Sequence, residues 1–164
     1  MDYIIKPMET DEEIRGKAYV HWKSWQEAYR GIVDAGYLEH LTLETCLDRA
    51  YRYPENILVA KAGDAVVGFA AAGKYRSASE EASDEGEVYA LYVLEAYQKQ
   101  KVGYELMRRC LTKLSDCRVI YVWVLRDNAK AIAFYEKVGF RKDGAEKELM
   151  LGTPISVIRM AYQN

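Results

Sequence analysis

The chain has 164 residues, half of them hydrophobic and 29% charged, with a formal net charge of -2 at pH 7. This length and balance predict one compact domain spanning residues 1–164, and they exclude a disordered or membrane-embedded chain. A slightly acidic chain also lacks the basic footprint of a nucleic-acid-binding protein. No apolar run is long enough to cross a bilayer, and the first residues alternate as a strand does, not as a signal peptide does. We therefore expect a cytoplasmic protein without a membrane partner.

Apolar periodicity divides the chain into short strands and helices. In chain order we expect a strand at 2–6, a helix from Thr10 to Gly31, helices at 34–41 and 43–51, strands at 57–60 and 66–70, a polar loop at 75–86, a strand at 88–94, a helix at 101–114, a strand at 119–125, a helix at 128–138, and strands near 140–150 and 154–162. A helix between two wholly apolar strands is typical of a βαβ unit with a right-handed crossover. The fold class is therefore α/β, with a mixed sheet of about seven strands flanked by helices.

The first long helix has a clear start. Thr10 is followed three residues later by Glu13, which is the spacing of a capping box. Apolar residues then recur at steps of three and four, which predicts one buried face made of Ile14, Ala18, Trp22, Trp25, Tyr29 and Ile32.

The segment from Gln98 to Gly103 joins an apolar strand to a helix. The first turn of a helix leaves main-chain N–H groups without partners and carries the positive end of the helix dipole, so a pyrophosphate can bind there. Gly103 would let the main chain approach closely, and Lys99 and Lys101 add positive charge. An ordinary strand-to-helix connection with solvated lysines is the alternative, and this loop alone does not decide between them.

Two segments carry a resemblance to a known family. Glu87-Val88-Tyr89-Ala90-Leu91-Tyr92-Val93 followed by Tyr97 to Gly103, and Asn128-Ala129-Lys130-Ala131-Ile132-Ala133-Phe134-Tyr135 through Phe140, are similar to the two characteristic segments of the GNAT superfamily of N-acetyltransferases. The resemblance covers about the last two-thirds of the chain, by a fold-level comparison. Lys101 departs from the family's loop pattern, which has a glycine at this place. A lysine fits there with helical dihedral angles and fits less well with a positive φ.

The resemblance implies a GNAT-like fold and acetyl-CoA as co-substrate. The implied cofactor-binding residues are those of the loop, of the central strand and of the second segment: Leu91, Tyr92, Val93, Gln98, Lys99, Gln100, Lys101, Val102, Gly103, Asn128, Lys130 and Tyr135. The pantetheine arm is expected along the main chain of the central strand, in a slot opened where that strand and the strand at 119–125 separate, often at a bulge. Capping a helix is the commoner use of an asparagine such as Asn128, and the two roles are compatible.

Acetyl transfer to an amine needs a neutral amine, donors for the oxyanion and a proton for the departing thiolate. The resemblance makes Tyr135 the candidate general acid, although a tyrosine on a helix's inner face is usually a core residue. Glu87 is the candidate base, acting directly or through water; a solvated carboxylate is the alternative, and an amine with a lowered pKa needs no base. His21 and His40 are weaker candidates, since such residues more often pack or face solvent.

The acceptor is an amine of unspecified size. Trp22, Trp25 and Tyr29 are candidate substrate-binding residues because an aromatic wall attracts cations, and Glu27 would add negative charge. A tryptophan stripe at helical spacing is, however, first a core stripe. The run from Tyr29 to Ile32 is similar to bacterial small-molecule members, some of which acetylate polyamines. A small amine, an amino acid, a polyamine and a peptide amino terminus all stay open.

The function expected is thus transfer of acetyl from acetyl-CoA to a primary amine of a small molecule or peptide, by direct attack in a ternary complex. A non-catalytic acyl-CoA-binding or sensing domain of the same fold is the main alternative. A nucleotide-binding domain is disfavoured because the chain has no P-loop sequence. The three cysteines form no metal-ligand pattern, so we expect no metal ion. A homodimer through a sheet edge or the carboxy-terminal strands is a further expectation.

Overall fold

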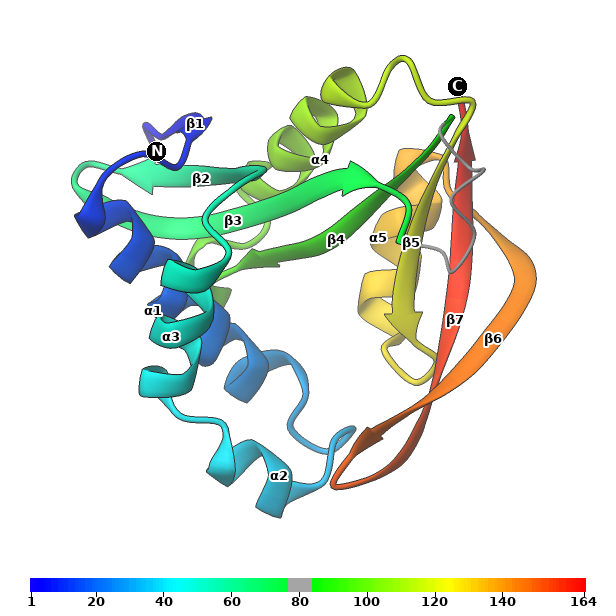
Figure 1. The fold of residues 1–164 in the computed structure, drawn as a ribbon, viewed down its shortest axis with the longest axis horizontal. Coiled ribbons are helices and arrows are strands. Elements are labelled where there is room, and N and C mark those ends of the chain that lie inside the picture. The colour runs from blue at the N-terminus through cyan, green and yellow to red at the C-terminus, as the bar shows by residue number, and fades with distance from the viewer. Residues whose placement is uncertain (77–83) are drawn as a thin grey trace.

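The structure is a computed structural model, and it describes residues 1–76 and 84–164. In chain order its elements are β1 (Ile4–Pro7), α1 (Asp11–Ala28), α2 (Ala35–His40), α3 (Leu43–Arg52), β2 (Ile57–Ala62), β3 (Ala65–Lys74), β4 (Glu85–Val93), the short 3-10 turn η1 (Glu95–Tyr97), α4 (Val102–Lys113), β5 (Val119–Leu125), α5 (Ala129–Val138), β6 (Arg141–Leu151) and β7 (Thr153–Gln163). The strands form one seven-stranded sheet in the order β1-β2-β3-β4-β5-β7-β6, drawn in Figure 1. The expected mixed sheet flanked by helices is confirmed.

The βαβ unit at the centre is also confirmed. β4 and β5 are parallel neighbours, with α4 in the connection between them, whereas the other neighbouring strands are antiparallel. Two strand boundaries beside the expected polar loop were predicted wrongly. β3 continues to Lys74, beyond the expected end at residue 70. β4 begins at Glu85, inside the expected loop at 75–86, because Glu85 and Gly86 pair with Val119 and Ile120 of β5. Long-range pairing thus overrides the polar local sequence. The part of that expected loop at 77–83 lies outside the described residues.

Two helical layers cover the two faces of the sheet. On one face, α4 and α5 contribute Leu106, Met107, Cys110 and Ile132 to the largest apolar core, together with alternate residues of the central strands. On the other face, Val20 of α1 packs against residues of β2 and β3. α3 lies outside α1, and Figure 1 shows these two helices side by side.

The predicted apolar stripe of α1 is only partly directed at the sheet. Ala18, Trp22 and Trp25 pack with Cys46 and Ala50 of α3. The other buried residues of α1, which lie outside this apolar stripe, are largely polar. Glu13, Lys17 and Ser24 are all more than nine-tenths buried. Lys17 lies with its Nζ 4.7 Å from the centre of the Phe69 ring, and burial lowers its pKa. Helical periodicity identified the apolar face correctly but could not say which element covers it.

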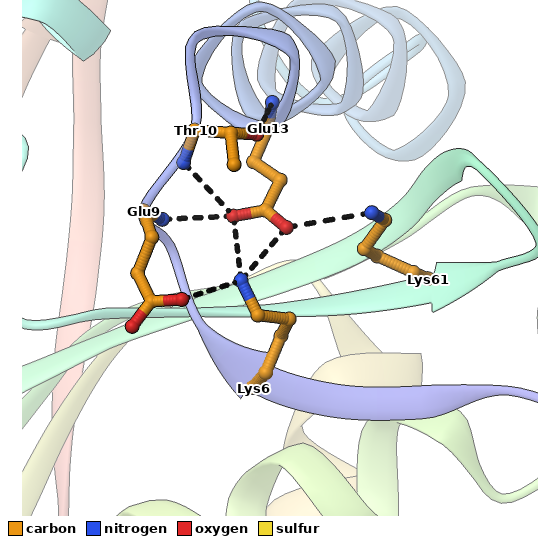
Figure 2. Close-up of polar contacts among 5 residues, drawn as sticks. All are labelled: Lys6, Glu9, Thr10, Glu13 and Lys61. Atoms are coloured by element: carbon orange, nitrogen blue, oxygen red, sulfur yellow. Dashed lines mark hydrogen bonds and ion pairs between the residues drawn. The ribbon is translucent and has the colours of Figure 1, made fainter.

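The predicted capping box is confirmed, and it belongs to a larger polar network shown in Figure 2. Thr10 Oγ1 accepts the Glu13 N–H at 3.2 Å, and the Glu13 carboxylate accepts the N–H groups of Glu9 and Thr10. Lys6 of β1 lies 2.8 Å from the same carboxylate, and Lys61 of β2 lies 3.4 Å from it. The hydrogen bond from Lys6 is the largest of the effects that lower the pKa of Glu13 to about 2. One buried carboxylate therefore ties the start of α1 to two strands.

Candidate active site

The two central strands separate after a short paired segment. Only Glu85, Gly86 and Glu87 of β4 pair with β5, and the ladder stops at the Glu87–Tyr121 pair. Figure 1 shows the two strands diverging from there. On its other side β4 stays paired with β3, but the register shifts so that Ala71 faces Ala90 and Ala72 faces Val88. Tyr89 is thus the extra residue of a bulge, which bends β4 away from β5.

The pairing of β4 with β3 shows which main-chain N–H and C=O groups of β4 have no partner strand after Glu87. Leu94 donates its N–H to Val67, which makes 94 and 67 a hydrogen-bonded pair of the antiparallel ladder. Such pairs alternate, so Tyr92 also directs its N–H and C=O at β3. Leu91 and Val93 direct theirs to the opposite edge, where β5 has moved away. Of the three residues predicted to offer their main chain, Leu91 therefore has both groups available and Tyr92 has its main chain engaged. Val93 has its N–H available, whereas its carbonyl accepts from Gln98.

The predicted phosphate loop connects η1 to α4 and is firmly held. Gln98 donates from its Nε2 to the Val93 carbonyl at 3.1 Å, and its Oε1 accepts from Lys130 of α5 at 2.6 Å. The N–H groups from Lys99 to Tyr104 donate to no residue in the described part of the chain. A run of oriented, unpartnered N–H groups at a helix start is a ready anion site. The residues of the loop therefore fit the pyrophosphate of a nucleotide-containing cofactor.

The loop has two residues in the left-handed region, Lys99 (φ 61°) and Lys101 (φ 67°). The family's loop pattern has a glycine at the position of Lys101. Lys101 adopts the positive φ, which suits a lysine less well than helical dihedral angles do. A side chain in this region costs about 1 kcal/mol relative to glycine. The structure thus gives a physical reason for the glycine of the pattern and shows that this chain tolerates the strain.

We expect Lys101→Gly to raise the free energy of unfolding by ~0.5 kcal/mol, because relief of the strained φ exceeds the added freedom of the unfolded chain. Lys101→Ala is the matched control, since it removes the charge but keeps the side chain that causes the strain. Urea unfolding of the three proteins measures the difference. A glycine variant less stable than the alanine variant would show that the positive φ carries no strain.

Asn128 and Tyr135 lie at the start and on the inner side of α5. Asn128 caps the helix, with its side-chain oxygen accepting the Ala131 N–H at 3.1 Å. Tyr135 packs against the apolar core on the α4–α5 side of the sheet, the same cluster against which Leu91 and Val93 pack. Its hydroxyl makes no hydrogen bond to a described residue and yet is not sealed off from solvent. Burial raises the pKa of Tyr135 well above its ordinary value, and the nearby Tyr92 raises it further. The phenol is therefore protonated at neutral pH.

Glu87 lies on the face of the sheet opposite to α4 and α5, at the last paired position of β4. It is 6% exposed, and its Oε1 accepts the N–H of Arg76 at 3.1 Å. The Arg76 guanidinium lies 3.8 Å from the other oxygen. Burial raises the pKa of Glu87, and the contacts with Arg76 oppose this rise. A carboxylate with a raised pKa is a better base than a solvated one.

The four predicted acceptor-side residues are not all together. Trp25 and Tyr29 lie at the end of α1 with their ring centres 4.8 Å apart, in a cluster that includes residues of α2 and β7. Trp22 packs only against the α3 cluster, which Trp25 also contacts. Glu27 accepts the N–H of Glu95, the first residue of η1, at 2.9 Å. This carboxylate joins α1 to the turn that precedes the phosphate loop, so its visible role is structural.

The two histidines differ in their surroundings. His21 is half-buried beside Trp25 and Tyr92, and its Nδ1 is buried without a hydrogen-bond partner. Burial, followed by the cations Lys17 and Arg49, lowers its pKa to about 4, so it is a weak base. His40 is exposed at the end of α2, where its Nδ1 contacts the Gly36 carbonyl at 2.6 Å.

The sequence did not predict that the hydroxyl groups of two tyrosines, Tyr29 and Tyr92, would meet. The side chain of Tyr92 and the hydroxyl of Tyr29 are joined by a 2.9 Å hydrogen bond. Tyr92 was assigned only a main-chain role, and Tyr29 only an aromatic one. The residues are 63 positions apart, so no local pattern could pair them; the abundance of tyrosine, 14 residues, was the only available signal.

In the described part of the chain, His, Cys, Asp and Glu side chains nowhere gather in threes around a point suited to a metal ion. The same residues contain no helix that is long and apolar enough to cross a membrane.

The fold and this site define an acetyltransferase. The model of the acetyltransferase (GNAT) family matches residues 11–140, and the chain belongs to that family. An uncharacterized N-acetyltransferase of Bacillus subtilis, YuaI, is 33% identical over 129 residues, which are 76% of this chain and 73% of the relative. The [ribosomal protein bS18]-alanine N-acetyltransferase of Escherichia coli is 31% identical over 87 residues, covering 45% of this chain and 59% of the relative.

Solved structures show the same fold. The PaiA N-acetyltransferase of Thermoplasma acidophilum in complex with coenzyme A superposes with a TM-score of 0.76 over the whole of both chains, at 21% identity. The structure of PH1933 from Pyrococcus horikoshii also gives a TM-score of 0.76, at 21% identity over 99% of each chain.

Proposed function

We propose that this acetyltransferase moves the acetyl group of acetyl-CoA to a primary amine of a small molecule or peptide, by direct attack in a ternary complex. The observation that carries the proposal is the opening between β4 and β5. The main chain of Leu91 and the N–H of Val93 face this opening, and Tyr135 packs against the same apolar cluster as these two residues. The loop with the free N–H groups follows β4 and η1. The loop is joined to this opening by the bond from Gln98 to Val93.

The loop would bind the phosphates of the co-substrate, and β4 would bind its pantetheine arm. The pyrophosphate would accept hydrogen bonds from the N–H groups between Lys99 and Tyr104, with help from the helix dipole of α4. Lys130, already fixed by Gln98, would add a positive charge beside the loop. The pantetheine arm would pair with the main chain of Leu91 and Val93 as an added strand. Asn128 would offer its side-chain N–H₂, because only its oxygen is used in the cap.

The chemistry would then use groups from both sides of the opening. The N–H of Val93 would stabilise the oxyanion that forms on the thioester carbonyl. Tyr135 would donate its proton to the departing thiolate, since its raised pKa keeps the phenol protonated. Both groups come from elements fixed by the core, so they cost little to orient.

Glu87 would remove the first proton from the acceptor ammonium, directly or through water, before the attack. We expect Glu87→Gln to lower kcat/KM at pH 7 by ~10-fold or more and to shift the rising limb of the pH profile to higher pH, because only the amine's own ionisation then supplies the nucleophile. Glu85→Gln, on the same strand, is the control. A pH profile unchanged by Glu87→Gln would remove this residue from the mechanism.

The acceptor class is open between small molecules and peptides. Trp25 and Tyr29 support a partly aromatic acceptor side, and Trp22 and Glu27 have other contacts. The Escherichia coli relative is named for an alanine of a ribosomal protein, which keeps a peptide amino terminus among the candidates. The homodimer and the cytoplasmic location stay predictions.

The proposal is tested by calorimetry with coenzyme A followed by a thiol-release assay of acetyl-CoA with a library of amines, amino acids, polyamines and short peptides. We expect binding together with acceptor-dependent thiol release. Binding without turnover on any amine would favour a sensing domain of the same fold. Mass spectrometry of the product identifies the acetylated nitrogen.

A further inference from the structure

A cluster of aromatic and basic side chains lies across β5, β7 and β6, on the same face of the sheet as Glu87. Glu87 of β4 is paired with Tyr121 of β5, and side chains two residues apart on a strand share a face, so Trp123 is on this face too. Arg159 of β7 is the paired residue of Trp123 and joins them there. This cross-strand cluster consists of Tyr75, Tyr121, Trp123, Lys147 and Arg159.

The positive charge of Arg159 is already compensated within the cluster. Its Nε donates to the Asp143 carboxylate at 2.6 Å, and its Nη1 donates to the Tyr75 hydroxyl at 3.2 Å. The guanidinium lies 4.1 Å from the centre of the Tyr121 ring, and the ring centres of Tyr75 and Tyr121 are 4.8 Å apart. Arg159 therefore fixes the aromatic side chains in place and has little capacity left for a ligand.

Lys147 differs from Arg159 in having no carboxylate partner. Its Nζ lies 4.0 Å from the centre of the Trp123 ring, and the ammonium makes no ion pair or hydrogen bond with a described residue. The carboxylates beside the cluster are each paired with an arginine: Glu87 with Arg76, Asp143 with Arg159, and Glu85 with Arg118. The exposed Lys147 ammonium is thus available to an anion from solution.

Glu87 and Lys147 place opposite charges at two ends of this face. The Lys147 ammonium lies over Trp123, which is two residues beyond Tyr121, the partner of Glu87. Two residues of a strand correspond to roughly 7 Å. Burial raises the pKa of Glu87, whereas Arg76 and then Lys147 act in the opposite direction, so the ammonium influences the charge at this carboxylate. A ligand several bonds long can therefore contact both groups.

We propose, on the basis of the function proposed above, that Lys147 determines acceptor specificity and that the acceptor is an amine with a carboxylate several bonds away. Glu87 would receive the amine end, and Lys147 would donate to the carboxylate end. The chain between them would pass along the aromatic side chains of β5. A polyamine is disfavoured, because its second ammonium would meet the charge of Lys147.

The test compares three acceptors of equal chain length at one pH: γ-aminobutyrate, its amide and putrescine, which end in a carboxylate, a neutral amide and an ammonium. For the wild type we expect kcat/KM to be about fivefold higher for the acid than for the amide, and lowest for putrescine. This preference should shrink as the ionic strength rises, because the Lys147 ammonium is solvated.

Lys147→Glu should reverse the order of the acid and putrescine. We expect the ratio of their kcat/KM values to fall by ~10-fold or more, since an attraction is replaced by a repulsion. The value for the amide should stay within about twofold, which shows that the variant is folded and active. Lys142→Glu is the matched control. Lys142 is an exposed lysine of the same strand on the opposite face, since its paired residue Met160 is in the core under α4 and α5.

Two peptide amides distinguish the possible sources of the carboxylate. One has alanine followed by glutamate, and the other has alanine followed by glutamine. A Lys147-dependent preference for the glutamate peptide identifies an acidic peptide terminus, and a preference confined to the γ-aminobutyrate series identifies a free amino acid.

A purely structural Lys147 predicts that Lys147→Glu changes kcat/KM for all acceptors by the same factor, and that result would overturn the inference. A wild type that turns over the amide and putrescine as well as the acid would also overturn it, while leaving the proposed function intact. A wild type that acetylates no amine would instead overturn the proposed function, and this inference with it.

Discussion

Tyr135→Phe is expected to lower kcat by ~10²-fold or more while leaving the protein as stable as the wild type. The expected loss follows from the proton that the thiolate needs, which a phenyl ring cannot supply. The unchanged stability follows from the structure, since the Tyr135 hydroxyl makes no hydrogen bond to a described residue and the ring, which does the packing, is kept. Steady-state kinetics with a saturating acceptor and thermal unfolding measure the two quantities.

The control for this variant is Tyr162→Phe, which removes a phenol hydroxyl from the same core without approaching the opening between the strands. The affinity for coenzyme A should stay the same in both variants, because the phosphates and the pantetheine arm are assigned to other groups. A fully active, folded Tyr135→Phe protein would remove Tyr135 from the mechanism and favour direct protonation of the thiolate by water.

The largest effect on stability is expected for Glu13→Gln. The wild-type carboxylate is 2% exposed and accepts from Lys6, Lys61 and two main-chain N–H groups (Figure 2). A glutamine can still accept the N–H bonds, but it leaves the Lys6 ammonium with only the exposed Glu9 carboxylate, 2.9 Å away, as a charge partner, and it removes the negative charge beside Lys61. We expect a loss of ~2 kcal/mol in the free energy of unfolding at pH 7, since Lys6 and Lys61 keep some solvent contact. Urea unfolding measures it, and Glu12→Gln, at the exposed neighbouring position, is the control.

The pH dependence of this loss has a definite sign. The pKa of Glu13 is about 2 in the folded protein and close to its ordinary value of 4.5 in the unfolded chain. The stabilisation by the carboxylate is therefore complete above about pH 5 and decreases as the pH falls from there toward 2. The difference in unfolding free energy between wild type and Glu13→Gln should shrink over the same window. A difference that stays constant from pH 7 to pH 3 would show that packing, and not charge, holds this position.

Local signals predicted much of this molecule. The capping box of Thr10 and Glu13 needs only residues three apart, and the βαβ unit needs only two apolar strands with a helix between them. The starts and ends of most elements were within two residues of those observed, and the sheet was recognised as mixed. The candidate loop and Tyr135 were identified by resemblance to a family to which the chain belongs.

What could not be predicted depends on contacts between distant residues. The bond between Tyr29 and Tyr92 joins the end of α1 to β4, and the bond from Glu95 to Glu27 joins α1 to η1; neither has a sequence signature. Trp22 was grouped with Trp25 by helical spacing, but α3 covers Trp22, and periodicity does not name the covering element. The positive φ of Lys101 arises because the chain must turn from η1 into α4 within a few residues.

The two helical layers differ in how they are held on the sheet, because α1 buries the polar residues Glu13, Lys17 and Ser24. The α4–α5 layer packs on the sheet mainly through the large apolar core, which ionic strength affects little. In the α1–α3 layer, many apolar side chains of α1 pack against α3. The first turn of α1 is held to β1 and β2 by the Glu13 carboxylate, which lies between Lys6 and Lys61. Added salt weakens attraction between partly solvated charges. The attachment of the layer that bears Trp25 and Tyr29 is thus expected to weaken as the ionic strength rises, whereas the attachment of the layer that bears Tyr135 is expected to change little.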